Sequence, residues 1–86
     1  MKTSEYEITI EQTEGNLSKD WYFNIKIEYY IFEDYSEISS VEILDASLYT
    51  YNSVTDEEFE SEYKKEDIPK DIKNILNHKI EELNLY

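Results

Sequence analysis

Residues 21–32 read WYFNIKIEYYIF, and their pattern is the clearest structural signal in the sequence. Polar and apolar side chains alternate along it, and a period of two with many aromatic and β-branched residues is typical of a half-buried β-strand. A strand of this length, rising about 3.3 Å per residue, is expected to be the central one of a sheet. The face expected in the core consists of Trp21, Phe23, Ile25, Ile27, Tyr29 and Ile31.

Two further segments are predicted to flank this strand. Residues 5–12 alternate in the same way, and the turn signal around Gly15 separates them from the central strand. After a predicted turn at 33–37, a third strand is expected over residues 38–51. Its apolar set changes parity between Ile43 and Leu44, which a β-bulge near Leu44 would reconcile, with two shorter strands as the alternative. Sequential strands with short loops favour an antiparallel meander.

The pattern changes after residue 54. Residues 55–58 read TDEE and match a capping box with Thr55 as N-cap and Glu58 reaching back, which predicts a short helix to about residue 65. Phe59 and Tyr63 fit this helix, although residues 59–63 also fit strand alternation. Pro69 suits the first turn of another helix. Its apolar stripe follows at helical spacing: Ile72, Ile75, Leu76, Ile80 and Leu83.

These elements together predict an α+β fold. It consists of an antiparallel β-meander of about three strands packed against one or two C-terminal helices. A length of 86 residues leaves room for a single domain, residues 1–86. The hydrophobic content of 40% and the nine tyrosines exceed what is typical of a disordered acidic tail, so we expect a folded chain.

Charge is the most informative property of the composition. Twenty-one acidic residues stand against eight lysines, with no arginine, and give a net charge of −13. The excess lies in residues 1–62, because residues 63–86 hold five acids and five lysines. Such a chain is poorly suited to neutralise phosphates, so we expect no direct binding to nucleic acid or to an anionic membrane. The absence of an apolar run favours a cytoplasmic location.

The residues that most catalytic and metal sites require are scarce. The sequence has no cysteine, and its one histidine, His78, is expected on the polar side of the last helix. Gly15 alone cannot form a phosphate-binding loop. The acidic cluster Asp56, Glu57, Glu58, Glu60 and Glu62 lacks the alternation and the central glycine of a calcium loop. We therefore expect a protein that is not an enzyme and has no catalytic residue, cofactor or metal ion.

The outer face of the sheet remains as the candidate binding surface. Alternation places a series of acids there, interspersed with tyrosines, and the cluster at 56–62 is expected at its rim. The candidate partner-binding residues are Glu5, Glu7, Glu11, Glu28 and Glu42, the aromatic Tyr22 and Tyr30, and Asp56, Glu57 and Glu58. Spaced carboxylates with aromatic rings between them are similar to phosphates and stacked bases. The expected partner is a basic protein, in particular a nucleic-acid-binding enzyme.

These features lead to the hypothesis of an inhibitor that mimics DNA or RNA. In size, charge and lack of cysteine the chain is similar to phage anti-restriction and anti-CRISPR proteins and to uracil-glycosylase inhibitors, and it contains no motif of any of them. One alternative is an immunity protein or antitoxin that neutralises a basic toxin. Another is a structural or adaptor module that self-associates through the edges of its sheet and patches of exposed tyrosines, for example as a homodimer. The charge also has a simple explanation in solubility.

Overall fold

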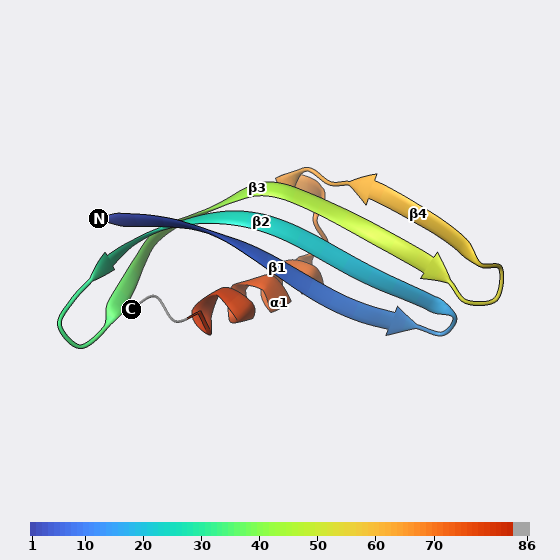
Figure 1. Cartoon of the computed structure of the whole chain (residues 1–86), viewed down its shortest axis with the longest axis horizontal. Coiled ribbons are helices and arrows are strands. Elements are labelled where there is room, and N and C mark those ends of the chain that lie inside the picture. The colour runs from blue at the N-terminus through green and yellow to red at the C-terminus, as the bar shows by residue number, and fades with distance from the viewer. Residues whose placement is uncertain (84–86) are drawn as a thin grey trace.

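The computed structural model describes residues 1–83 and shows a four-stranded antiparallel sheet with the strand order β1-β2-β3-β4 (Figure 1). The strands are β1 (Lys2–Glu14), β2 (Leu17–Ile31), β3 (Ser36–Asn52) and β4 (Glu57–Glu62). A 3-10 turn, η1 (Lys65–Asp67), and one helix, α1 (Lys70–Glu81), follow them. The predicted α+β meander is confirmed, with four strands in the described part of the chain where about three were expected.

β2 is the central strand of the meander, as its alternation predicts. It pairs with β1 on one side and with β3 on the other. Five of the six residues expected in the core are buried, from Trp21 to Tyr29. The prediction is wrong for Ile31, whose side chain is 40% exposed. The end of β2 runs past α1 (Figure 1), so the helix described in residues 1–83 does not cover this end of the strand.

The register between β2 and β3 contains two irregularities. Asn24 pairs with Asp45 and Ile25 with Ile43, so Leu44 is the extra residue of a bulge. This confirms the bulge predicted near Leu44 and one continuous third strand. A second bulge at Ser39 was not anticipated, although the apolar residues also change parity between Ile38 and Val41.

Residues 57–62 form β4, so the helix predicted from Thr55 is wrong. The chain reverses through residues 53–56, where the Asn52 side chain accepts hydrogen bonds from the backbone N–H groups of Val54 and Thr55. Asp56 adopts a positive φ of 59°, which takes the backbone out of a helical path. Asn52 thus organises the turn in place of a Thr55 cap, and β4 pairs with the end of β3.

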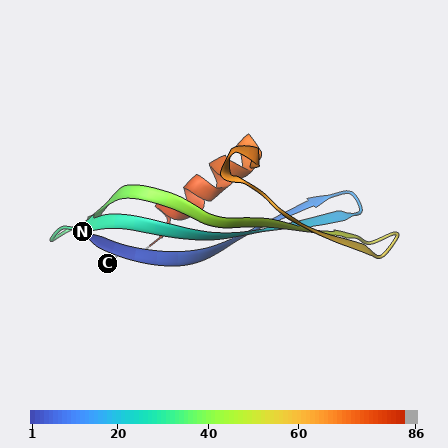
Figure 2. The same cartoon turned by 90° about the horizontal axis from the view of Figure 1, so that it is seen from above.

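α1 covers the inner face of the sheet (Figure 2). Pro69 is the residue directly before its first turn, and Ile72, Leu76 and Ile80 are buried against the sheet, which confirms the predicted apolar stripe. Ile68, which precedes Pro69, is also buried in this core. The Tyr63 ring packs edge-on against the Trp21 ring, with 4.9 Å between the ring centroids. This contact extends the core toward β4.

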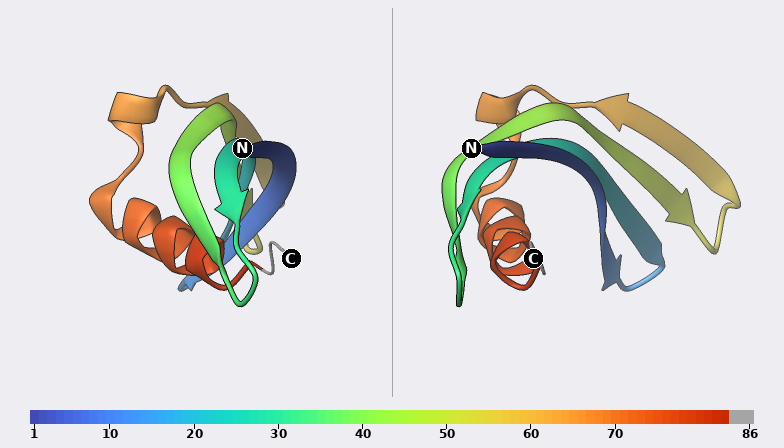
Figure 3. Two further views of the ribbon diagram at one scale, coloured as in Figure 1. Left: turned by 90° about the vertical axis from the view of Figure 1, so that its left-hand side faces the viewer. Right: turned by 60° about the vertical axis from the view of Figure 1, so that its left-hand side comes forward.

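The molecule is elongated, with extents of 53 × 21 × 18 Å. Its radius of gyration is 15.3 Å, against about 12 Å for a compact chain of this length. The sheet curves over α1 (Figure 3), and the β1–β2 and β3–β4 hairpin ends extend beyond it (Figure 1). The opposite face of the sheet carries no second layer within the described residues (Figure 2). That bare face is where the acidic residues gather.

Candidate functional site

The outer face of the sheet is defined by the residues that point away from α1. Directly paired residues share a face, so the register assigns each side chain. Eleven of the twenty-one acidic residues lie on this face, together with one of the eight lysines, Lys26. The acids are Glu5, Glu7, Glu11, Asp20, Glu28, Glu37, Glu42, Asp45, Glu58, Glu60 and Glu62.

Acidic residues cluster in one cross-strand row near the β1–β2 and β3–β4 turns. One cross-strand row joins Glu11, Asp20, Tyr49 and Glu60, and therefore holds three acidic residues with no lysine. Lys26 belongs to a row farther along the sheet, where it stands between Glu5 of β1 and Glu42 of β3. Like charges in one row repel each other. The four-stranded part of the outer face therefore holds five acidic residues and no lysine.

A notch of about 350 Å³ lies where β4 ends beside β3. Its lining combines polar and acidic side chains with the apolar Leu44, Ala46 and Tyr63. The acids are Asp45, Glu60 and Glu62, and the polar side chains are Asn24 and Ser47. A single lysine or arginine side chain from another protein fits a polar, acid-lined notch of this kind.

Two tyrosines of β3 are fixed by carboxylates from the β3–β4 hairpin. The Tyr49 hydroxyl donates a hydrogen bond of 2.6 Å to Glu58, and the Tyr51 hydroxyl donates one of 2.6 Å to Asp56. The hydrogen bond to Glu58, together with desolvation, raises the pKa of Tyr49 to about 12. The bond to Asp56 raises the pKa of Tyr51 in the same way. Both rings are thereby held in place among the acids of the outer face.

The structure gathers most of the predicted binding residues on one surface. Those that lie on the outer face are Glu5, Glu7, Glu11, Glu28, Glu42, Glu58, Tyr22 and Tyr30. Asp56 lies in the β3–β4 turn at the rim. Glu57 pairs with Asn52 on the other parity and points to the inner side of the sheet. Ser40 donates a hydrogen bond to Glu28.

Five acids of this face were not among the predicted binding residues, and one of them, Glu37, lies in β3 although it was expected in the turn at 33–37. Asp20 precedes Trp21, and extending the β2 alternation by one position places it there. The bulge at Leu44 hides Asp45, because it reverses the parity of β3. Glu60 and Glu62 require residues 57–62 to be a strand, so the strand alternation of residues 59–63 was the signal for them.

The remaining candidate groups lie elsewhere. His78 is on the exposed side of α1, with Nδ1 3.9 Å from Glu81. Among residues 1–83, no cluster of three or more acid, histidine or cysteine side chains is arranged to hold a metal ion. None of the helices described is long and apolar enough to cross a bilayer. Comparisons with protein-family models, with curated proteins and with solved structures found no match.

Proposed function

We propose that the protein is an inhibitor whose outer face binds a basic, nucleic-acid-handling enzyme in the place of its nucleic acid. The observation that carries this proposal is the concentration of eleven acids and one lysine on a single exposed face. A solubility role alone requires only that charge be spread over the surface. Here, more than half of the acids share one side of one sheet.

The density of charge on this face supports mimicry. One strand of DNA carries a charge about every 3.4 Å, or about sixteen over a length of 53 Å. Eleven acids distributed along a molecule 53 Å long reach the same order. A groove built to neutralise phosphates with lysine and arginine therefore meets a comparable number of anions here, spread over four strands.

Other features of the face suit it to a protein partner. The tyrosines Tyr22, Tyr49 and Tyr51 stand between the acids, at positions where stacked bases would otherwise meet the enzyme. The notch lined by Asp45 and Glu60 offers a place for one basic side chain of the partner. Tyrosine and arginine are the residues most often found at the centre of such interfaces.

The experiment is a capture from a cell lysate with the tagged protein at low salt, followed by elution with increasing salt. Three forms are compared: the unchanged chain, a triple variant Glu7→Gln/Glu11→Gln/Glu60→Gln, and a control Glu33→Gln/Glu66→Gln/Glu82→Gln. Both variants lose three charges, but only the first loses them from the outer face. We expect the unchanged chain and the control to capture one basic nucleic-acid enzyme that salt releases. Equal capture by the outer-face variant contradicts the proposal.

The alternative role, an immunity protein or antitoxin that neutralises a basic nuclease toxin, would use the same surface. It would give the same result in the capture experiment. The two roles differ in the enzyme that is captured, since a toxin nuclease is lethal when it is expressed without its partner. A growth assay with the captured enzyme alone, and with both proteins together, separates them.

Self-association is a second candidate because of one further observation. At the β2–β3 turn, Tyr30, Phe32 and Tyr35 form an exposed aromatic cluster. The Phe32 and Tyr35 rings are stacked, with 4.7 Å between their centroids. An exposed cluster of this type is typical of a contact between proteins. A homodimer formed here persists at high salt, which sedimentation at two salt concentrations measures. The same experiment on Phe32→Ser tests whether the cluster is the contact.

A further inference from the structure

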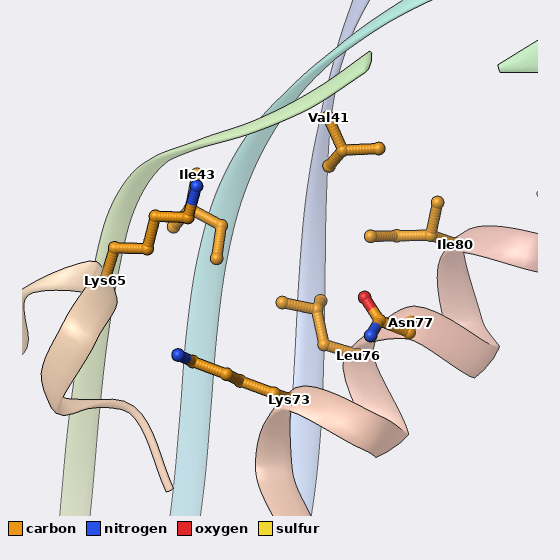
Figure 4. A pocket seen from close by; sticks show the side chains of 7 residues that line it. All are labelled: Val41, Ile43, Lys65, Lys73, Leu76, Asn77 and Ile80. Atoms are coloured by element: carbon orange, nitrogen blue, oxygen red, sulfur yellow. The ribbon is translucent and has the colours of Figure 1, made fainter. Parts of the chain in front are cut away.

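A cavity of about 160 Å³ lies on the helical side of the molecule, apart from the outer face (Figure 4). Its apolar lining comes from two layers, with Val41 and Ile43 on β3 and Leu76 and Ile80 on α1. β4 pairs with residues 47–52 of β3, so none of the strands described in residues 1–83 pairs with the edge of β3 beside this cavity.

The polar part of the lining is basic. Lys65 reaches in from η1 alongside Ile43, Lys73 extends from α1, and Asn77 adds an amide (Figure 4). Within residues 1–83 the ion pairs are Lys19–Glu14 and His78–Glu81, so neither lysine of the cavity has a carboxylate at ion-pair distance. In a chain of net charge −13, two such lysines over an apolar cavity are unexpected.

The chemistry of this lining selects the ligand. An apolar cavity of about 150 Å³ is large enough for a molecule the size of benzene. Ammonium and amide groups donate hydrogen bonds, and those to a carboxylate are among the stronger ones. We propose that this cavity binds a small apolar monocarboxylate, whose ring or short chain lies against Leu76 and Ile43 and whose carboxylate meets Lys65 and Lys73.

A small molecule suits the cavity better than an added peptide strand. The free edge of β3 contains both bulges, at Ser39 and Leu44. Bulges interrupt the ladder of N–H and C=O groups and twist the edge, and this protects an edge from pairing with another strand. The site is independent of the proposed function of the outer face.

The test is a titration followed by amide NMR with three probes that share a phenyl ring: benzoate, benzamide and benzylamine. We expect benzoate to shift the resonances of Ile43 and Leu76 and to bind about tenfold more tightly than neutral benzamide, because it adds charge-assisted hydrogen bonds. Benzylamine should cause no shift at these residues. Equal affinities for benzoate and benzamide, or no shift with benzoate, would overturn the proposal.

Two double variants locate the site. Lys65→Gln/Lys73→Gln should weaken benzoate binding about tenfold. The control Lys64→Gln/Lys70→Gln removes the same charge from neighbouring residues that do not line the cavity, and should leave the affinity unchanged. Equal weakening in both variants would show attraction to the general charge of this side and would contradict a built site. If the first variant does not fold, the comparison of the three probes on the unchanged chain still decides.

Discussion

Tyr49 and Tyr51 show how single residues order the acidic surface. Each donates its hydroxyl hydrogen to a carboxylate of the β3–β4 hairpin, which favours the neutral phenol over the phenolate. The pKa of Tyr49 is therefore about 12 in the folded chain, above the ordinary value of 10.0. Because the folded pKa is raised, the stabilisation is fully present below pH 10 and is lost as the pH rises toward 12.

The Glu58→Gln substitution should lower the pKa of Tyr49 toward its ordinary value. Glutamine still accepts the hydrogen bond but removes the negative charge that disfavours the phenolate. The measurement is a titration of the Tyr49 ring resonances by NMR. Glu60→Gln is the matched control, because Glu60 pairs with Tyr49 across the strands without accepting its hydrogen bond. An unchanged Tyr49 pKa in Glu58→Gln would contradict the described contact.

At the scale of elements, the turn between β3 and β4 depends on Asn52. Its side chain accepts hydrogen bonds from two backbone N–H groups, while Thr55 caps nothing among the described elements. Asn52→Ala should therefore cost about 1 kcal/mol of unfolding free energy, measured by urea denaturation. Thr55→Ala should cost much less. A larger loss from Thr55→Ala would instead support the capping box and a helix at residues 55–65.

This turn also shows where prediction from sequence ended. The alternation of β2 predicted its position, its core face and its central place, because a strand with one buried face leaves a period of two. β4 is different, since all six of its residues are exposed and no buried face leaves a pattern. Its four glutamates suit a helix start equally well. Pairing with β3, a tertiary contact, decides between the two.

α1 is held by its buried stripe, and Ile72 is the most completely buried residue of it. Ile72→Val removes one methyl group from the core and should lower the unfolding free energy by about 1 kcal/mol. Ile75→Val is the matched control, because Ile75 is only half-buried and should lose less. Urea denaturation of both variants checks this. Equal losses would mean that α1 packs on the sheet by another face.

For the molecule as a whole, the acidic side chains of the outer face are at least partly exposed to solvent and repel one another. Eleven acids share it with one lysine, and salt screens their repulsion. The unfolding midpoint should therefore rise with added salt. Glu7→Gln/Glu11→Gln/Glu60→Gln should raise it at low salt more than Glu33→Gln/Glu66→Gln/Glu82→Gln, because only the first set relieves the crowded face. Thermal unfolding at two salt concentrations measures this. An equal rise in both variants would contradict the crowding.

Much of this surface could be anticipated from the sequence, and the reason lies in the regularity of two strands. Glu5, Glu7 and Glu11 follow the alternation of β1 directly. The positions of Asp45 and Glu62 could not be anticipated in this way. The face of Asp45 depends on the bulge at Leu44, and Glu62 lies in β4, a strand without a buried face. Both residues line the notch between β3 and β4, which could not be predicted from the sequence because it depends on the pairing of these strands.

The outer face is proposed to occupy the nucleic-acid site of a basic enzyme. The most direct test is competition, in which labelled duplex DNA bound to the captured enzyme is displaced by this protein and followed by fluorescence anisotropy. We expect full displacement by the unchanged chain. Glu7→Gln/Glu11→Gln/Glu60→Gln should be weaker by about tenfold, while Glu33→Gln/Glu66→Gln/Glu82→Gln should be unchanged. Simultaneous binding of DNA and protein to the enzyme would contradict the proposed function.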